Sequence, residues 1–77
     1  MIDVLLFAQL REDTGKEKIS IQAEGMTVKE LKQKLFSIYK IQTSAQIMVA
    51  INEEYVLEDE RIEAGDTVAF IPPVSGG

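Results

Sequence analysis

Only one segment of this 77-residue chain has the apolar periodicity of a long helix, and it lies near the middle. The run reads EGMTVKELKQKLFSIYK, and Thr27 and Glu30 have the spacing of a capping box, which predicts where the helix begins. An apolar stripe at helical spacing follows, formed by Val28, Leu31, Leu35 and Ile38. Any fold of this chain must therefore bury the apolar stripe of this one helix against another part of the same chain.

The segments on either side of this helix have the patterns of strands. Apolar or alternating runs predict strands over residues 2–7, 18–22, 46–52 and 67–71, with a further short strand in NEEYV. The segment Arg11–Lys16, which contains Gly15, predicts a turn that joins the first two strands as a hairpin. This order is typical of an α+β β-grasp, a mixed sheet of four to five strands around one main helix. We expect a domain over residues 1–71 and a protruding tail over residues 72–77.

Alternation along the first and last strands divides their side chains between two faces. The set expected to point toward the helix comprises Val4, Leu6, Val68 and Phe70. The set expected to point away from it comprises Leu5, Phe7, Ala69 and Ile71. If the two strands are neighbours, the second set forms an exposed apolar patch at the base of the tail, which indicates a binding surface unless a loop covers it.

Composition excludes several classes of chemistry. The chain has no Cys and no His, which removes thiolate nucleophiles, Cys/His zinc sites and histidine acid–base relays. Its acidic runs lack the spacing of a calcium loop, so we expect no bound metal. The net charge of −5 disfavours nucleic acid and anionic membranes as partners. No segment has the pattern of a signal peptide or a membrane span, which predicts a cytoplasmic protein.

The last six residues, PPVSGG, predict a tail suited to insertion into another protein. Pro72 and Pro73 cannot continue a β-ladder and favour an extended backbone. Gly76 and Gly77 have no side chains, so a narrow slot could admit them. The terminal α-carboxylate is ionised at neutral pH and can attack the α-phosphorus of ATP to give an acyl-adenylate. A sulfur nucleophile can then displace AMP and leave a thiocarboxylate.

The segments VLLFAQLRE, INEEYV and GDTVAFIPPVSGG resemble the small, sulfur-carrying subunits of molybdopterin synthase. The resemblance implies a ubiquitin-like β-grasp that is not an enzyme on its own and binds no cofactor. It implies that an activating enzyme consumes ATP to adenylate Gly77 and that a sulfur donor protein converts it to a thiocarboxylate. The tail then delivers sulfur to cyclic pyranopterin monophosphate in the large catalytic subunit, within a heterotetramer.

The resemblance also implies roles for individual residues. Gly77 is the reacting residue, and the tail inserted into the partner comprises Pro73, Val74, Ser75 and Gly76. The residues expected at the partner interface are Phe7, Arg11, Ala69, Ile71 and Pro72. For Arg11, a surface salt bridge is the alternative to a partner contact.

Three other functions remain open at this point. A sulfur carrier for thiamine thiazole synthesis also ends in Gly-Gly on a β-grasp, although that family's last strand generally lacks FIPPVSGG. A ubiquitin-like protein modifier would form isopeptide bonds through Gly77. A plain β-grasp binding module would leave its terminus unused.

Overall fold

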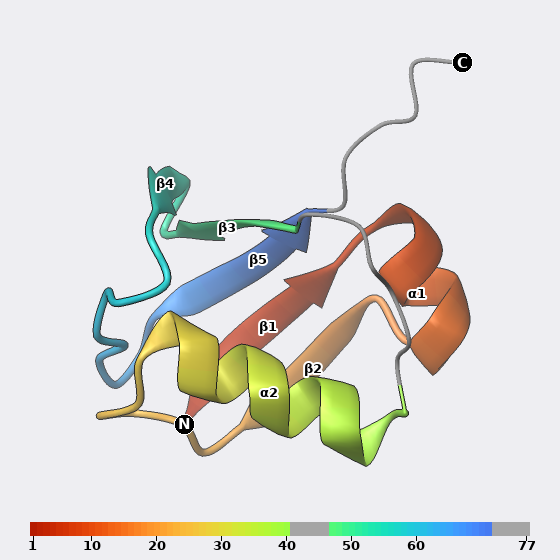
Figure 1. Ribbon diagram of the computed structural model, residues 1–77, viewed down its shortest axis with the longest axis horizontal. Helices are drawn as coiled ribbons and strands as arrows, with labels where there is room; N and C mark the ends of the chain where they lie inside the picture. Colours follow the sequence, from red (N-terminus) through yellow and green to blue (C-terminus); the bar gives the residue numbers. More distant parts are fainter. Residues whose placement is uncertain (41–46, 72–77) are drawn as a thin grey trace.

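The computed structural model describes residues 1–40 and 47–71, so the six tail residues and everything expected of them lie outside the described residues. The described chain forms a single mixed sheet and two helices (Figure 1). The strands are β1 (Ile2–Leu6), β2 (Lys18–Ile21), β3 (Met48–Ile51), β4 (Glu54–Val56) and β5 (Thr67–Ile71). The helices are α1 (Ala8–Thr14) and α2 (Val28–Ile38).

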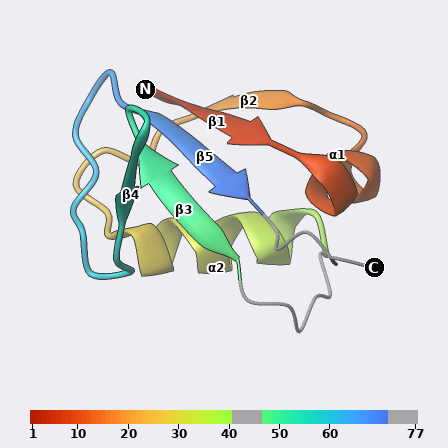
Figure 2. The ribbon, with the colours of Figure 1, turned by 90° about the horizontal axis from the view of Figure 1, so that it is seen from above.

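The strand order in the sheet is β2-β1-β5-β3-β4. The central strand β5 runs parallel to its neighbour β1, and every other neighbouring pair is antiparallel. The helix α2 lies along one face of this sheet (Figure 2). This arrangement is a β-grasp, as the sequence predicts, and β1 and β5 are the neighbours that the expected apolar patch requires. The assignment of residues 72–77 to a separate tail stays a prediction.

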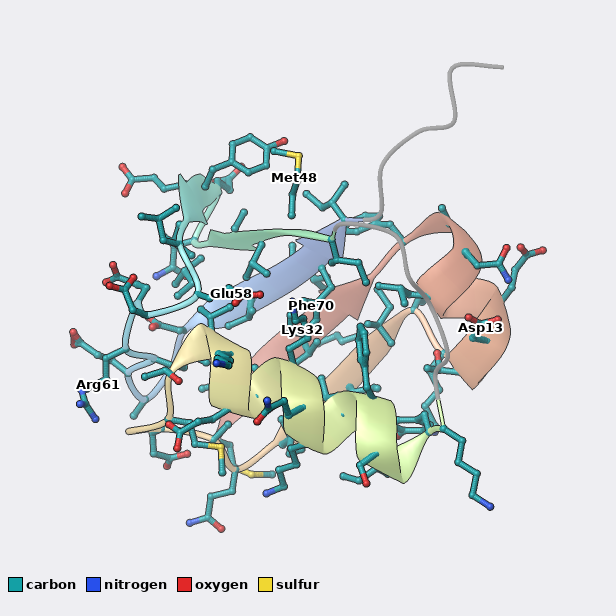
Figure 3. All side chains as sticks on the ribbon, viewed as in Figure 1. Asp13, Lys32, Met48, Glu58, Arg61 and Phe70 are labelled. Carbon is teal, nitrogen blue, oxygen red and sulfur yellow. The ribbon has the colours of Figure 1, made fainter. Side chains whose placement is uncertain are left out.

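The core fills the space between α2 and the inner face of the sheet. Val4, Leu6, Val68 and Phe70 are all buried, which confirms the predicted inward set. Figure 3 shows Phe70 between the sheet and α2. From α2 itself, Val28, Leu31 and Leu35 are buried in the same cluster.

The N-terminus of α2 has the predicted capping box. The Thr27 hydroxyl accepts a hydrogen bond from the backbone N–H of Glu30 at 3.3 Å, and Glu30 Oε1 accepts one from the backbone N–H of Thr27 at 2.9 Å. These bonds satisfy N–H groups that a helix end otherwise leaves without partners. The sequence thus fixes the start of α2 correctly.

The prediction that Ile38 belongs to the buried stripe of α2 is wrong, because Ile38 is 54% exposed. At about 100° per residue, Ile38 lies about 80° around the helix from Val28, whereas Tyr39 lies only about 20° from it. Tyr39 is half-buried and packs on the core, together with Phe36. The last turn therefore contacts the core through its aromatic residues and turns Ile38 to the surface.

The prediction of a simple turn over residues 11–16 is also wrong, because the connection contains α1. The strand β1 ends at Leu6 and β2 begins at Lys18, which leaves residues 7–17 to connect them. The short helix lets Leu10 reach the core, where it is 1% exposed. It ends at Gly15, whose φ of 72° is the left-handed conformation that favours glycine at a helix C-terminus.

Neither described helix is long and apolar enough to cross a bilayer.

Candidate functional site: the outer face of the sheet

The face of the sheet that points away from α2 carries a row of aligned side chains. Leu5 of β1 pairs with Ala69 of β5, Ala69 pairs with Ala50 of β3, and Ala50 pairs with Tyr55 of β4. Directly paired residues point to the same side of a sheet, so these side chains form one row across four strands. Two alanines at the centre of the row leave room that larger side chains would fill.

That room is an open hollow of about 610 Å³ on the outer face. It is lined by Leu5, Phe7, Ala50, Asn52, Glu53, Tyr55, Thr67, Ala69 and Ile71. Phe7 is 45% exposed and Tyr55 is 66% exposed. Within residues 1–40 and 47–71, then, no loop covers the patch predicted from strand alternation. We call this surface the outer-face hollow.

The outer face changes in character along the strands. At the end where β1 and β5 finish, the side chains are apolar, because Phe7 follows β1 and Ile71 pairs with Met48. Met48 is half-exposed and projects from β3 away from α2 (Figure 3). At the other end of the same strands, Asp3 pairs with Thr67, so the surface becomes polar. The apolar end lies directly at Ile71, the residue that precedes the tail in sequence.

The structure brings three of the predicted interface residues together and places the fourth apart. Phe7, Ala69 and Ile71 all line the outer-face hollow. Arg11 lies on α1 and forms an exposed ion pair with Glu17, with 3.3 Å between Nη2 and Oε2. This is the salt bridge that the sequence left open for Arg11. Pro72 lies outside the described residues.

Sequence reasoning missed part of this surface. Ala50 and Tyr55 line the hollow, and Met48 lies beside it as the partner of Ile71, although only β1 and β5 were expected to supply this surface. A signal was present, since Val49 and Ile51 point inward and strand alternation turns Met48 and Ala50 outward. The contribution of Tyr55 depends on the pairing of β4 with β3, which follows from the turn between them.

Among residues 1–40 and 47–71, three carboxylates have clearly lowered pKa values, and none of the three lines the hollow. Hydrogen bonds from the backbone N–H and the hydroxyl of Thr27 lower the pKa of Glu30. A hydrogen bond from Lys32 lowers the pKa of Glu58, and this pair joins α2 to the loop after β4 (Figure 3). The backbone N–H of Glu24 and the N-terminal ammonium lower the pKa of Glu24. These shifts reflect caps and surface ion pairs in the fold.

The described part of the hollow is therefore suited to docking. The residues that line it are mainly apolar, and none of them is a Cys, His or Lys. In residues 1–40 and 47–71, no three potential metal ligands come together. An apolar surface of this kind can bind a protein.

Comparison with known proteins identifies the family. Residues 4–77 match the model of the ThiS family. The molybdopterin synthase sulfur carrier subunit of Escherichia coli K12 is 37% identical over 81 residues, covering 100% of both chains. The chain belongs to the ThiS family, among the molybdopterin synthase sulfur carrier subunits. The subunit of the same name from Dictyostelium discoideum is 39% identical over 80 residues, covering 96% of this chain and 93% of its own.

Solved structures of similar fold agree with this family assignment. The small archaeal modifier protein 1 of Methanosarcina acetivorans has a TM-score of 0.76 and 26% identity, with coverage of 99% of this chain and 95% of its own. The fold of this ThiS family member is thus a ubiquitin-like β-grasp, as the resemblance implies.

Proposed function

We propose that this chain is the sulfur carrier subunit of a molybdopterin synthase and acts as a co-substrate of the complex. The observation that carries the proposal is the match to sulfur carrier subunits of that synthase at 37–39% identity over nearly the whole chain. The family match extends to residue 77, so it includes the segment in which the chemistry would take place. The function is carriage of sulfur, with catalysis by the partners.

The first step in this proposal is activation of Gly77. An activating enzyme binds ATP, and one oxygen of the Gly77 carboxylate attacks the α-phosphorus. The bond to the β-phosphate oxygen breaks, and pyrophosphate leaves. The terminal sulfur of a donor persulfide then attacks the acyl carbon, and AMP leaves with the oxygen that attacked the phosphorus, which gives an acyl disulfide. A second thiol of the donor attacks the donor-side sulfur of this acyl disulfide, so that a donor disulfide forms and the thiocarboxylate is released. The chain itself supplies only an ionised, unhindered terminus.

The second step is delivery to the large catalytic subunit. The segment Pro73–Gly76 enters that subunit's active site, where the thiocarboxylate transfers sulfur to cyclic pyranopterin monophosphate. The outer-face hollow supports this step, because Phe7, Ala69 and Ile71 form an apolar docking surface next to the residue from which the tail begins. Two deliveries supply the two sulfurs of the dithiolene. The complex would be a heterotetramer in the cytoplasm.

Mass spectrometry of the intact protein tests the carrier function. Incubation with the activating enzyme, ATP and a sulfur source should exchange one oxygen for one sulfur and raise the mass accordingly. Addition of the large synthase subunit and cyclic pyranopterin monophosphate should then yield molybdopterin and restore the original mass. An unchanged mass in the first incubation would contradict every carrier function, including that for thiamine. Sulfur transfer to a thiazole synthase, and none to the large subunit, would favour the thiamine carrier.

A second function has one observation in its favour. The structural relative from Methanosarcina acetivorans is named a modifier protein, and its fold matches over nearly the whole chain. A modifier would use the same acyl-adenylate of Gly77 but pass it to a lysine amine, forming an isopeptide bond. Conjugates of high mass that appear in cells and vanish when Gly77 is deleted would support this function.

A further inference from the structure

The turn between β3 and β4 holds an acidic residue in a conformation that favours glycine. Asn52 and Glu53 connect the two strands, and both have positive φ, at 50° and 72°. Two-residue hairpins with positive φ at both positions are type I′ turns, in which asparagine followed by glycine is preferred. Asn52 fits this pattern. Glu53 occupies the position where a glycine would be free of strain.

Hydrogen bonds within the chain explain why an asparagine occupies position 52. Its side-chain Nδ2 donates to Asp66 Oδ1 at 3.0 Å, and its Oδ1 accepts from the backbone N–H of Thr67 at 3.0 Å. These bonds tie the turn to the start of β5. The side chain of Glu53 has no such role, since it forms no hydrogen bond or ion pair with any other described residue and is exposed. The strain at Glu53 is thus not offset by a contact in the described part of the fold.

Glu53 lies at a specific place on the proposed docking surface. It lines the outer-face hollow, at the end where the sheet turns polar. Residue 71 and residue 67 are four positions apart on β5, which corresponds to about 13 Å along a strand. Glu53 follows Asn52, whose backbone N–H bonds to the carbonyl of Thr67. A partner that covers the hollow from Ile71 to Thr67 would reach this carboxylate.

Within residues 1–40 and 47–71, two carboxylates near Thr67 have partners in the chain. Asp3 accepts from Ser20 at 3.0 Å and forms an ion pair with Lys18 at 3.6 Å. Asp66 accepts from Asn52 and from the backbone N–H of Glu63. Glu53, in contrast, has no hydrogen-bond or ion-pair partner among the described residues and is exposed, so its carboxylate is available to a basic side chain. Strained residues without a structural role often mark functional positions.

We propose that Glu53 pairs with a lysine or arginine of the large synthase subunit and so fixes the orientation in which the outer-face hollow docks. This inference rests on the proposed function and adds a residue and a charge to it. Apolar contacts at the Ile71 end position the base of the tail, but an apolar patch alone tolerates rotation. A charge pair about 13 Å from that end defines a direction on the surface. The tail then enters its slot in one orientation.

The test measures binding of the full-length chain to the purified large subunit by calorimetry. Glu53→Gln keeps the size and the backbone strain of the residue and removes its charge. At about 0.1 M salt we expect the Kd of this variant to be about two- to fivefold weaker than that of the wild type. The difference should disappear at about 1 M salt, where the pair is screened. Glu53→Lys should weaken binding further, by about tenfold, because it faces a like charge.

Two further variants separate docking from general effects. Glu60→Gln makes the same change in net charge at an exposed residue outside the hollow, and its Kd should equal that of the wild type. Glu53→Gly should raise the melting temperature, because it relieves the strain, and weaken binding as Glu53→Gln does. Equal binding by wild type and Glu53→Gln at low salt would overturn the inference, and so would equal loss in Glu60→Gln.

The yield of molybdopterin as a function of large-subunit concentration distinguishes this inference from the proposed function. Glu53→Gln should need about two- to fivefold more large subunit than the wild type to reach half of its maximal yield, in step with its weaker Kd, whereas Glu60→Gln, outside the hollow, should follow the wild-type curve. A wild type that makes molybdopterin while Glu53→Gln binds normally would leave the function intact and refute the role of Glu53. A wild type that neither binds the large subunit nor makes molybdopterin would refute both.

Discussion

The docking role of the outer-face hollow makes a quantitative prediction for Phe7. Phe7 is 45% exposed in the free chain, and a phenylalanine offers roughly 200 Å² of surface. A partner that covers the hollow would bury about 90 Å² of its ring. At about 25 cal/mol per Å², this burial contributes about 2 kcal/mol to binding. Phe7→Ala should therefore weaken the Kd for the large subunit by about 30-fold.

The assay is calorimetric titration of the large subunit with wild type and variant, accompanied by thermal unfolding of each free chain. Leu57→Ala is the matched control, because Leu57 is 78% exposed and does not line the hollow. Its Kd should equal that of the wild type. The melting curve shows whether Phe7→Ala remains folded, since part of the ring already packs against its own chain.

A Kd for Phe7→Ala within about threefold of the wild type would correspond to less than about 0.7 kcal/mol and would refute the reasoning. Equal losses in Phe7→Ala and Leu57→Ala would also contradict it, since they would indicate that exposed apolar area anywhere on the surface contributes. The measurement therefore tests the location of the interface as well as its strength.

Three more predictions concern the tail, the core and acid stability. Deletion of Gly77 should abolish the oxygen-to-sulfur mass change and leave the melting temperature almost unaltered, because the buried core of the described residues ends at Phe70; a large fall in melting temperature would contradict this. Leu10→Ala should lower the free energy of unfolding by about 2–5 kcal/mol in denaturant titrations, because Leu10 is 1% exposed and anchors α1. A loss below about 1 kcal/mol would show that α1 packs loosely. Because the pKa of Glu30 is lower in the folded chain than its unfolded value of about 4.3, ionised Glu30 stabilises the fold above that pH. This contribution is lost as the pH falls through the folded pKa. Glu30→Gln should therefore flatten the decline of the denaturation midpoint between about pH 5 and about pH 3. An equally steep decline in that variant would assign the acid sensitivity to other carboxylates.

The docking surface could be predicted from the sequence only in part. Alternation in the first and last strands was sufficient to place Leu5, Ala69 and Ile71 on one face, because side-chain direction in a strand has a period of two. Whether those strands are neighbours depends on a parallel pairing between residues more than 60 positions apart. Local pattern does not encode such a pairing. Tyr55 joins this surface through the local β3–β4 hairpin and through the pairing of β3 with β5, which is a second long-range contact.

The two errors in the fold have a common cause. The helix α1 is seven residues long, and a helix this short is stable only because Leu10 enters a core formed by distant segments. Ile38 was expected inside because it continues an apolar stripe, but Phe36 and Tyr39 pack on the core at that end of α2 and Ile38 is exposed. In both cases tertiary packing selected among local patterns that were equally acceptable.

By itself, the sequence determined the identity of the main helix and its capped start, and the inward faces of the strands. Those properties follow from local hydrogen bonding and from fixed periodicities. The tertiary structure alone decided that two alanines from different strands meet to leave a hollow, and that a strained Glu53 lies on its rim. A binding surface depends on which strands become neighbours, and that choice is made by the core as a whole.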